Sequence, residues 1–428
     1  MKDIYFLILI FLLGPPAFRN IDDNFDTSSG DLDFWVYLKT ISYAIIIIVL
    51  FNKNLKIQKN NFLLTSNHNL VNVLFCIIFI FFMISSYFGN KFKYNSAYSI
   101  LFFSGFLIYR YLLNIFEISK DLKVITIIRF INYVFIFLIT FTLLLTIYNP
   151  SMTGAIFDGN NVRITGSKVS DLKVIPLITF IISLYLYLFD DKKIISKELI
   201  FILLSILSIY FGLTRSIVYV SLLIFILISV YYIFSKNVIK TNLSKKYLIY
   251  FIILFGVFFL SQNILSDFLT RNSTVSLFEL SGRNEIWNQI FIEMENKFLG
   301  FGPGSAIKDI FSQYPNLMLK NGKLLLSNNI GSAHNFYLEF YLSGGWVCLI
   351  SIILIHIILL INCVRFLKNY DLEGIIIFTL FVSYSSILIF ESFAFVPASN
   401  SFAFYWILLL LIAIKDKQKN IKDVKFKK

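Results

Sequence analysis

The sequence predicts an all-α membrane protein with about twelve transmembrane helices and one long external loop. Of its 428 residues, 57% are hydrophobic and 49 are phenylalanine, a composition that excludes a soluble globular domain. The apolar residues form segments that suit the roughly 20 residues of helix needed to cross hydrocarbon. Lysine and arginine are concentrated in alternate connections between these segments. We therefore expect a single polytopic domain over residues 1–428.

The predicted helices follow the apolar segments in chain order. They cover residues 4–18, 34–51, 70–88, 96–116, 123–148, 172–189, 197–211, 216–234, 247–265, 335–361, 373–393 and 400–414. The first segment is interpreted as an uncleaved span rather than a secretory signal, because it has no small-residue cleavage site and contains Pro15-Pro16. All three cysteines lie inside or just beside predicted helices, so we expect packing residues and neither a disulfide nor a zinc site.

Positive charge predicts the orientation of the chain. Basic connections follow the second, sixth, eighth and tenth segments, and lysines fill the C-terminal tail. Since cytoplasmic connections carry the excess of lysine and arginine, we expect these connections and both termini in the cytoplasm. The net charge of +13 is then largely topological, and lysines beside anionic lipid explain it without a nucleic-acid partner.

Residues 266–334 form the long external loop, between the ninth and tenth segments. Long ordered loops usually carry function. Residues 284–297 place their apolar side chains on one helical face, so we expect an amphipathic helix on the bilayer surface with Trp287 in the interface. A glycine cluster follows, in which the backbone N–H groups of Gly302 and Gly304 are candidates for binding an anion.

The three histidines differ in their predicted position relative to the membrane. Only His334 combines external exposure with the start of a span, where an imidazole can act as a base on a substrate at the membrane surface. His68 lies in a cytoplasmic connection and His356 near the cytoplasmic end of the tenth segment. For both of these we expect loop polarity or helix packing.

Three charged side chains are predicted on the same external side. Arg215 occupies the short turn after the seventh segment, Arg283 lies at the start of the loop helix, and Glu391 lies near the external end of the eleventh segment. An ionisable group at membrane depth is a functional candidate or is paired, so Glu391 is either the counter-ion of Arg215 or a catalytic acid. Two arginines and a histidine suit glycosyl transfer from a polyprenyl diphosphate sugar, because the leaving group gains negative charge while the acceptor hydroxyl needs a base.

Three motifs occur in order along the loop and its flanking helices. They are SGRNEIW at 281–287, LGFGPGS at 299–305, and His334-Asn335 followed by Leu338-Glu339 and Gly344-Gly345. Together they resemble the superfamily of O-antigen ligases and O-antigen polymerases, the membrane glycosyltransferases of bacterial surface polysaccharide assembly. Arg215 in its short external turn resembles the family's pattern as well.

The resemblance implies an undecaprenyl-diphosphate-linked oligosaccharide as donor and a metal-independent, inverting transfer without a cofactor. It implies His334 as the base toward the acceptor hydroxyl, with Arg215 and Arg283 holding the diphosphate. The other candidates then become substrate-binding residues: Asn335, Glu339, Glu391, Gly302 and Gly304. The implied setting is the bacterial plasma (inner) membrane with a periplasmic active site, with membrane lipids and a chain-length regulator as further partners.

Alternatives to this interpretation remain open. Cys348 stands where ligases carry Gly, Thr or Tyr, three residues beyond Gly345, which favours a polymerase over a ligase. In the first external connection, the aspartates resemble the carboxylates of metal-dependent membrane glycosyltransferases; they are Asp31 and Asp33 together with Asp22 and Asp23. A lipid-linked sugar flippase or secondary transporter is a different class, which is disfavoured because the two halves of the chain share no Gly/Pro-interrupted helices.

Overall fold

The computed structural model describes residues 2–13, 34–55, 66–89, 91–118, 123–150, 155–158, 161–164, 174–189, 195–212, 220, 283–295, 297–304, 310, 316–318, 324–326, 332–367, 372–395 and 399–426. The helices are α1 (Lys2–Leu13), α2 (Phe34–Leu55), α3 (Ser66–Phe88), α4 (Phe92–Ile118), α5 (Val124–Tyr148), α6 (Ile175–Phe189), α7 (Ile195–Gly212), α11 (Arg283–Met294), α13 (Phe336–Leu367), α14 (Leu372–Leu388), the 3-10 helix η3 (Phe393–Phe395) and α15 (Asn400–Phe426). The strands are β1 (Ala155–Asp158), β2 (Asn161–Ile164), β3 (Asn316–Met318) and β4 (Leu324–Leu326).

The helical membrane architecture is confirmed. A helix occupies each predicted segment except the eighth and ninth, which lie outside the described residues apart from residue 220. Within the described part, four helices are long and apolar enough to cross a membrane, and α6 and α14 contain shorter apolar helices. The full count of about twelve spans stays a prediction.

Two small antiparallel hairpins were not predicted. β1 pairs with β2 between α5 and α6, and β3 pairs with β4 within the long loop. Each strand has only three or four residues. Such short pairs are consistent with ordered connections at the ends of a helical bundle, and they leave the helical class unchanged.

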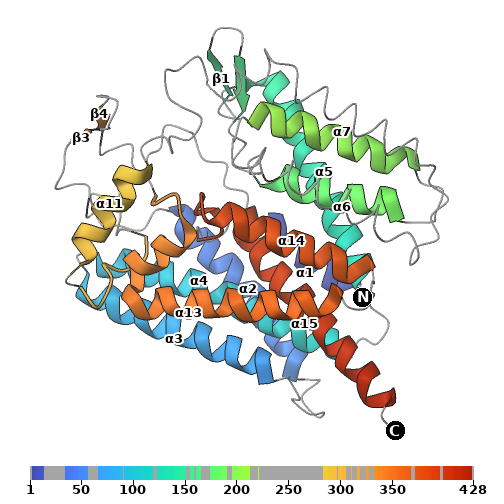
Figure 1. Cartoon of the computed structure of the whole chain (residues 1–428), viewed down its shortest axis with the longest axis horizontal. Coiled ribbons are helices and arrows are strands. Elements are labelled where there is room, and N and C mark those ends of the chain that lie inside the picture. Colours follow the sequence, from blue (N-terminus) through green and yellow to red (C-terminus); the bar gives the residue numbers. More distant parts are fainter. Residues whose placement is uncertain are drawn as a thin grey trace.

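α15 lies at the centre of the described helices. Its residues 402–413 are all buried, and it contacts α1, α4, α5, α13 and α14. Trp406 packs against Phe75 and Phe102, with ring centroids 4.8 and 5.7 Å away. Gly105 allows α4 to approach this ring, because an added Cβ would lie 2.3 Å from the Trp406 Nε1. Figure 1 shows α3 and the long part of α13 side by side, with α5, α6 and α7 grouped above them.

α13 is broken rather than continuous. Gly345 has φ 76 and ψ −164, which divides the helix into residues 336–344 and 346–367. The ring centroids of Tyr337 and His356 are 5.3 Å apart, whereas a continuous helix would separate the two residues by about 28 Å along its axis. The short first part therefore folds back along the second. The prediction of one continuous helix over residues 335–361 is therefore wrong, because the chain turns back at Gly345.

The fold-back also changes the place of His356. This residue lies in the middle of the second part of α13 rather than near its cytoplasmic end. Its side chain is buried and its ring lies 5.8 Å from that of Phe336 and 5.9 Å from that of Tyr405. The packing role expected for His356 is confirmed.

The glycine cluster covers the break in α13. The backbone N–H groups of Phe301 and Gly302 donate to the carbonyls of Leu342 and Ser343, at 2.7 and 3.1 Å. A continuous helix would satisfy these carbonyls with the N–H groups of residues 346 and 347, which the break displaces. An added Cβ at Gly345 would lie 2.0 Å from the Phe298 carbonyl oxygen, so only glycine permits this crossing.

Candidate active site

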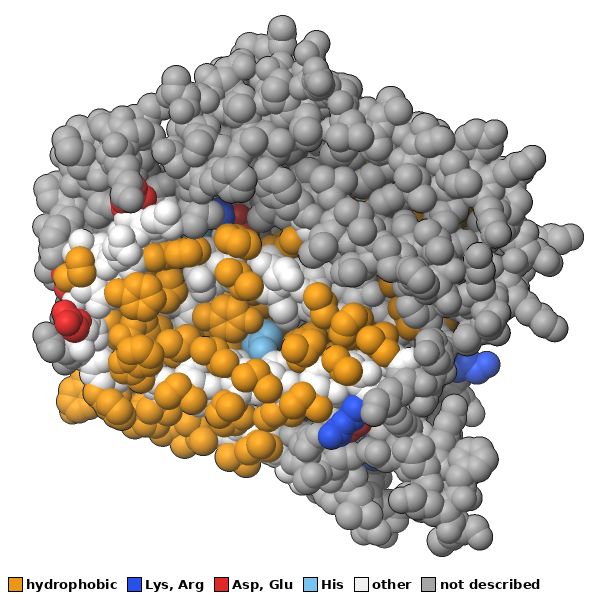
Figure 2. Space-filling view, in the orientation of Figure 1, with side chains coloured by type: hydrophobic (Ala, Val, Ile, Leu, Met, Phe, Trp, Pro, Cys, Tyr) orange, Lys and Arg blue, Asp and Glu red, His pale blue; other side chains and the backbone are white. Residues whose placement is uncertain are grey.

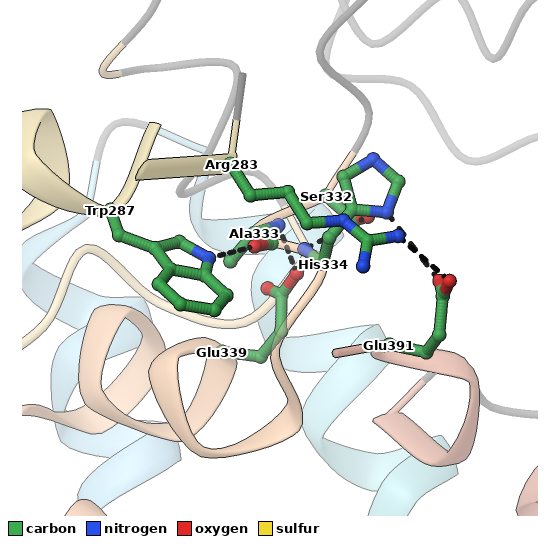
Figure 3. A network of polar contacts seen from close by, with 7 residues as sticks. All are labelled: Arg283, Trp287, Ser332, Ala333, His334, Glu339 and Glu391. Carbon is green, nitrogen blue, oxygen red and sulfur yellow. Dashed lines mark hydrogen bonds and ion pairs between the residues drawn. The ribbon is translucent and has the colours of Figure 1, made fainter. Parts of the chain in front are cut away.

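Three charged or titratable side chains from distant segments meet beside the first part of α13 (Figure 3). Glu391 follows the end of α14, Arg283 begins α11, and His334 precedes α13. The Arg283 Nη2 donates to the Glu391 Oε1 at 2.8 Å. The His334 Nδ1 lies 3.6 Å from the Glu391 Oε2, which is an ion-pair distance rather than a hydrogen bond. Glu391 therefore links the arginine to the histidine.

The three side chains differ in exposure in a way that suits a site open on one side. The Glu391 side chain is 6% exposed, that of Arg283 21% and that of His334 41%. A buried carboxylate needs charged or hydrogen-bonding partners, and Arg283 supplies one. The histidine ring is left accessible to a substrate.

His334 is the one non-glycine residue with positive φ among the described residues, at 50°. This left-handed conformation is unfavourable for a residue with a Cβ, and such strain is found preferentially at functional sites. The next residue starts the helix, because the Asn335 Oδ1 accepts the N–H groups of Tyr337 and Leu338 at 2.9 and 3.1 Å. Asn335 is therefore the N-cap of α13, and its Oδ1 is used by the helix.

Ala333, the residue before His334, is hydrogen-bonded through both its backbone N–H and its backbone carbonyl. The Ala333 N–H donates to the Glu339 Oε1 at 2.6 Å, and the Ala333 carbonyl accepts the Trp287 Nε1–H at 2.8 Å. The Ser392 hydroxyl donates to the same Glu339 carboxylate. Glu339 thus connects α13 to the segment that carries Glu391.

α11 packs its apolar face on α13. Ile286, Ile290 and Met294 form a buried cluster with Leu338 and Tyr341 of α13. Trp287 packs against this cluster and bonds to a backbone carbonyl. The helix is amphipathic as predicted, and its apolar face packs on α13. The position of Trp287 in the bilayer interface stays a prediction.

Gly302 and Gly304 lie against α4. Both have positive φ, at 90° and 94°. An added Cβ would lie 2.5 Å from the Asn95 Nδ2 at Gly302 and 2.7 Å from the Tyr94 ring at Gly304. The Gly302 N–H already donates to Ser343, so close packing explains this glycine, and anion binding at Gly304 stays a proposal.

A hollow of about 450 Å³ lies between α13 and α14. Its walls are mainly apolar, and Tyr337 and Ile389 place one end of it next to the segments that carry His334 and Glu391. The other lining residues are Ile353, His356, Ile357, Leu360, Phe381, Val382, Ser385 and Ser386. Figure 2 shows this side of the molecule, where hydrophobic side chains cover the described surface and a histidine is visible among them.

Of the predicted site residues, the structure brings His334, Arg283 and Glu391 into contact with one another. It pairs Glu391 with Arg283, whereas the sequence left a pairing with Arg215 or a catalytic acid open. Arg215 lies outside the described residues, as do Asp31 and Asp33 of the alternative metal site. Within the described part of the chain, no group of three His, Cys, Asp or Glu residues could hold a metal ion.

Trp287 is a site residue whose role the sequence did not reveal. Its partner is a backbone carbonyl 46 residues away, and a carbonyl has no sequence signature. A signal was nevertheless present, because Trp287 ends the SGRNEIW motif and stands four residues after Arg283. That spacing places both side chains on one face of α11.

Comparison with known proteins finds one family that is similar to part of the chain. Residues 200–353 match the O-antigen ligase family. The match includes α11, the glycine cluster, the break in α13 and both His334 and Arg283. No curated protein is similar enough to the chain to count as a match. The resemblance to the superfamily of O-antigen ligases and O-antigen polymerases is therefore confirmed.

Proposed function

Because residues 200–353 match the O-antigen ligase family, we propose that this protein is a membrane glycosyltransferase of bacterial surface polysaccharide assembly. It transfers an undecaprenyl-diphosphate-linked oligosaccharide to an acceptor sugar hydroxyl at the external face of the plasma membrane. The observation that carries the proposal is the convergence of His334, Arg283 and Glu391. A base, a fixed cation and a carboxylate that orients both suit glycosyl transfer to a hydroxyl.

In this proposal His334 is the general base. Its Nδ1 faces Glu391, which leaves Nε2 for the acceptor hydroxyl. The hydroxyl oxygen bonds to the anomeric carbon while the bond from that carbon to the diphosphate oxygen breaks, and the hydroxyl proton moves to Nε2. The resulting imidazolium lies beside the Glu391 carboxylate, which stabilises its charge and holds the ring. The 3.6 Å contact is expected to shorten with substrate bound.

The leaving group is a lipid diphosphate, and arginine is suited to hold it. Glu391 engages the Arg283 Nη2, and a guanidinium has further N–H donors that can bind phosphate oxygens. Arg215 is proposed as the second cation. Two guanidinium groups would supply the charge stabilisation without a metal or other cofactor.

The hollow between α13 and α14 is the proposed place for the hydrocarbon chain of the donor. Its apolar walls suit an isoprenoid, and it ends beside the charged site. A lipid in this hollow would place its diphosphate near Arg283 while the chain stays in hydrocarbon. Membrane lipid would occupy the hollow when the donor is absent.

Polymerase activity is our first candidate and ligase activity the second. Cys348 is buried, and its thiol donates to the Ile78 carbonyl at 3.7 Å. Residue 348 therefore packs against α3, and its departure from the Gly, Thr or Tyr of ligases is the reason for placing the polymerase first. The match to the O-antigen ligase family supports either enzyme over a flippase or transporter.

A genetic experiment separates these activities. In a deletion strain, surface glycan that stops at one repeat indicates a polymerase, and loss of all glycan from the lipid A core indicates a ligase. Purified protein should also join lipid-linked repeats in a detergent or liposome assay, and His334→Ala should abolish the transfer. Normal full-length glycan in the deletion strain would refute both activities.

A further inference from the structure

The backbone conformation of His334 depends on two side chains outside the charged cluster. Trp287 donates to the Ala333 carbonyl, and Glu339 accepts the Ala333 N–H, so both polar groups of this residue are bonded. Figure 3 shows the two side chains approaching Ala333 from α11 and from α13. No such pair of contacts is needed to start α13, because Asn335 already caps it.

A strained residue keeps its conformation only where its surroundings determine it. His334 has φ 50, in the left-handed region that glycine prefers. With Ala333 bonded on both sides and Asn335 bonded into the first turn of α13, the residues on either side of His334 cannot rotate freely. The direction of the imidazole is therefore set from its backbone as well as from Glu391.

We propose that Trp287 and Glu339 are positioning residues that hold His334 in its left-handed conformation and so aim its imidazole at the acceptor hydroxyl. This proposal rests on the proposed glycosyl transfer. It gives Glu339 a role through the backbone, in place of the substrate contact expected from sequence. The buried Glu339 carboxylate already has two hydrogen-bond donors, the Ala333 N–H and the Ser392 hydroxyl.

The same two residues also couple His334 to its partners. Trp287 and Arg283 lie one helical turn apart on α11, so the docking of this helix places the guanidinium and the peptide before His334 together. Glu339 is bonded to Ser392, the neighbour of Glu391. Each positioning residue therefore fixes His334 relative to one member of the charged cluster.

Four variants of the full-length protein test the proposal. Trp287→Phe keeps an aromatic ring and removes the N–H donor. Glu339→Leu removes the acceptor, whereas Glu339→Gln keeps an oxygen that can accept the Ala333 N–H. Tyr341→Phe is the matched control, because it removes a 3.4 Å hydrogen bond between α13 and the Met294 carbonyl at the end of α11 without touching His334.

The measurements are kcat and KM for transfer and the hydrogen exchange rate of the peptide containing Ala333. A misplaced catalytic group costs up to roughly 100-fold in rate, so kcat should fall about 10- to 100-fold in Trp287→Phe and Glu339→Leu while KM changes less than about twofold. Exchange of the Ala333 amide should accelerate at least about tenfold in Glu339→Leu, because its hydrogen bond is lost. Glu339→Gln and Tyr341→Phe should stay near wild type in both measurements.

Unchanged kcat in Trp287→Phe would overturn the proposal, as would an equal loss in Tyr341→Phe or a loss in Glu339→Gln as large as in Glu339→Leu. If Glu339→Leu does not fold, the kcat of Trp287→Phe measured against Tyr341→Phe decides alone. An inactive wild-type protein would refute the proposed function instead. In that case the exchange rates still test the positioning of His334, and unchanged exchange at Ala333 would refute it.

Discussion

Replacing Glu391 by glutamine should slow transfer by removing the charge that faces the protonated histidine. Glutamine has a similar size and keeps an oxygen for the Arg283 Nη2, so the perturbation is mainly electrostatic. An imidazolium and a carboxylate 3.6 Å apart interact by about 1 kcal/mol in water and about 5 kcal/mol at an effective dielectric constant of about 20. At about 1.4 kcal/mol per tenfold change, kcat should fall between roughly 5- and 4,000-fold.

The exposure of the two groups narrows this range. His334 is 41% exposed and Glu391 is 6% exposed, so water screens the pair on one side and the lower part of the range applies. We expect kcat to fall roughly 10- to 100-fold in Glu391→Gln, with little change in KM. Steady-state transfer from a lipid-linked donor measures both constants.

The matched control is Glu295→Gln, which removes a carboxylate from an exposed residue just beyond α11. It should leave kcat and KM unchanged. If Glu391→Gln raises KM and leaves kcat unchanged, Glu391 contacts substrate rather than supporting His334. If neither constant changes, the carboxylate has no part in the reaction and the reasoning fails.

Three further results are expected. Arg283→Lys keeps the charge but loses the planar guanidinium, so kcat/KM should fall by roughly tenfold or more in the same transfer assay. A lysine variant as active as wild type would argue against diphosphate binding by Arg283. Gly345→Ala should lower the unfolding free energy by about 2 kcal/mol or more, because φ is positive there and the added Cβ would lie 2.0 Å from the Phe298 carbonyl oxygen. Thermal unfolding measures this loss, and Gly374→Ala, at a glycine inside α14, is the control expected to lose less stability. Transfer should survive a chelator, and its loss with restoration by a divalent ion would support the metal-dependent alternative.

The helices could be predicted from the sequence because the hydropathy of a segment depends only on the residues within that segment. The apolar runs that became α3 to α7 and α15 need no partner to be recognised. The break in α13 was missed because Gly344-Gly345 interrupts a strongly apolar run without changing its hydropathy. Only the glycine cluster, which supplies hydrogen bonds to the freed carbonyls, explains why the chain breaks there.

The candidate site was predicted in part. His334, Arg283 and Glu391 could be placed on one side of the membrane from charge patterns, because ionisable residues are rare in spans. The partner of Glu391 could not be chosen, since both arginines were expected on that side. The contacts of Trp287 and Glu339 run to the backbone of Ala333, and contacts to backbone leave no complementary residue to find.

The break in α13 and the charged site depend on each other through the loop. Backbone carbonyls without partners are costly in a membrane protein, so the carbonyls of Leu342 and Ser343 require the N–H groups of the glycine cluster. That cluster follows α11 closely in the chain, so its docking also brings α11 onto the first part of α13. α11 in turn carries Arg283 to Glu391 and Trp287 to the peptide before His334. The spacing of the three sequence motifs therefore follows from one structural requirement, because the helix that starts after His334 is complete only when the loop that carries Arg283 is docked.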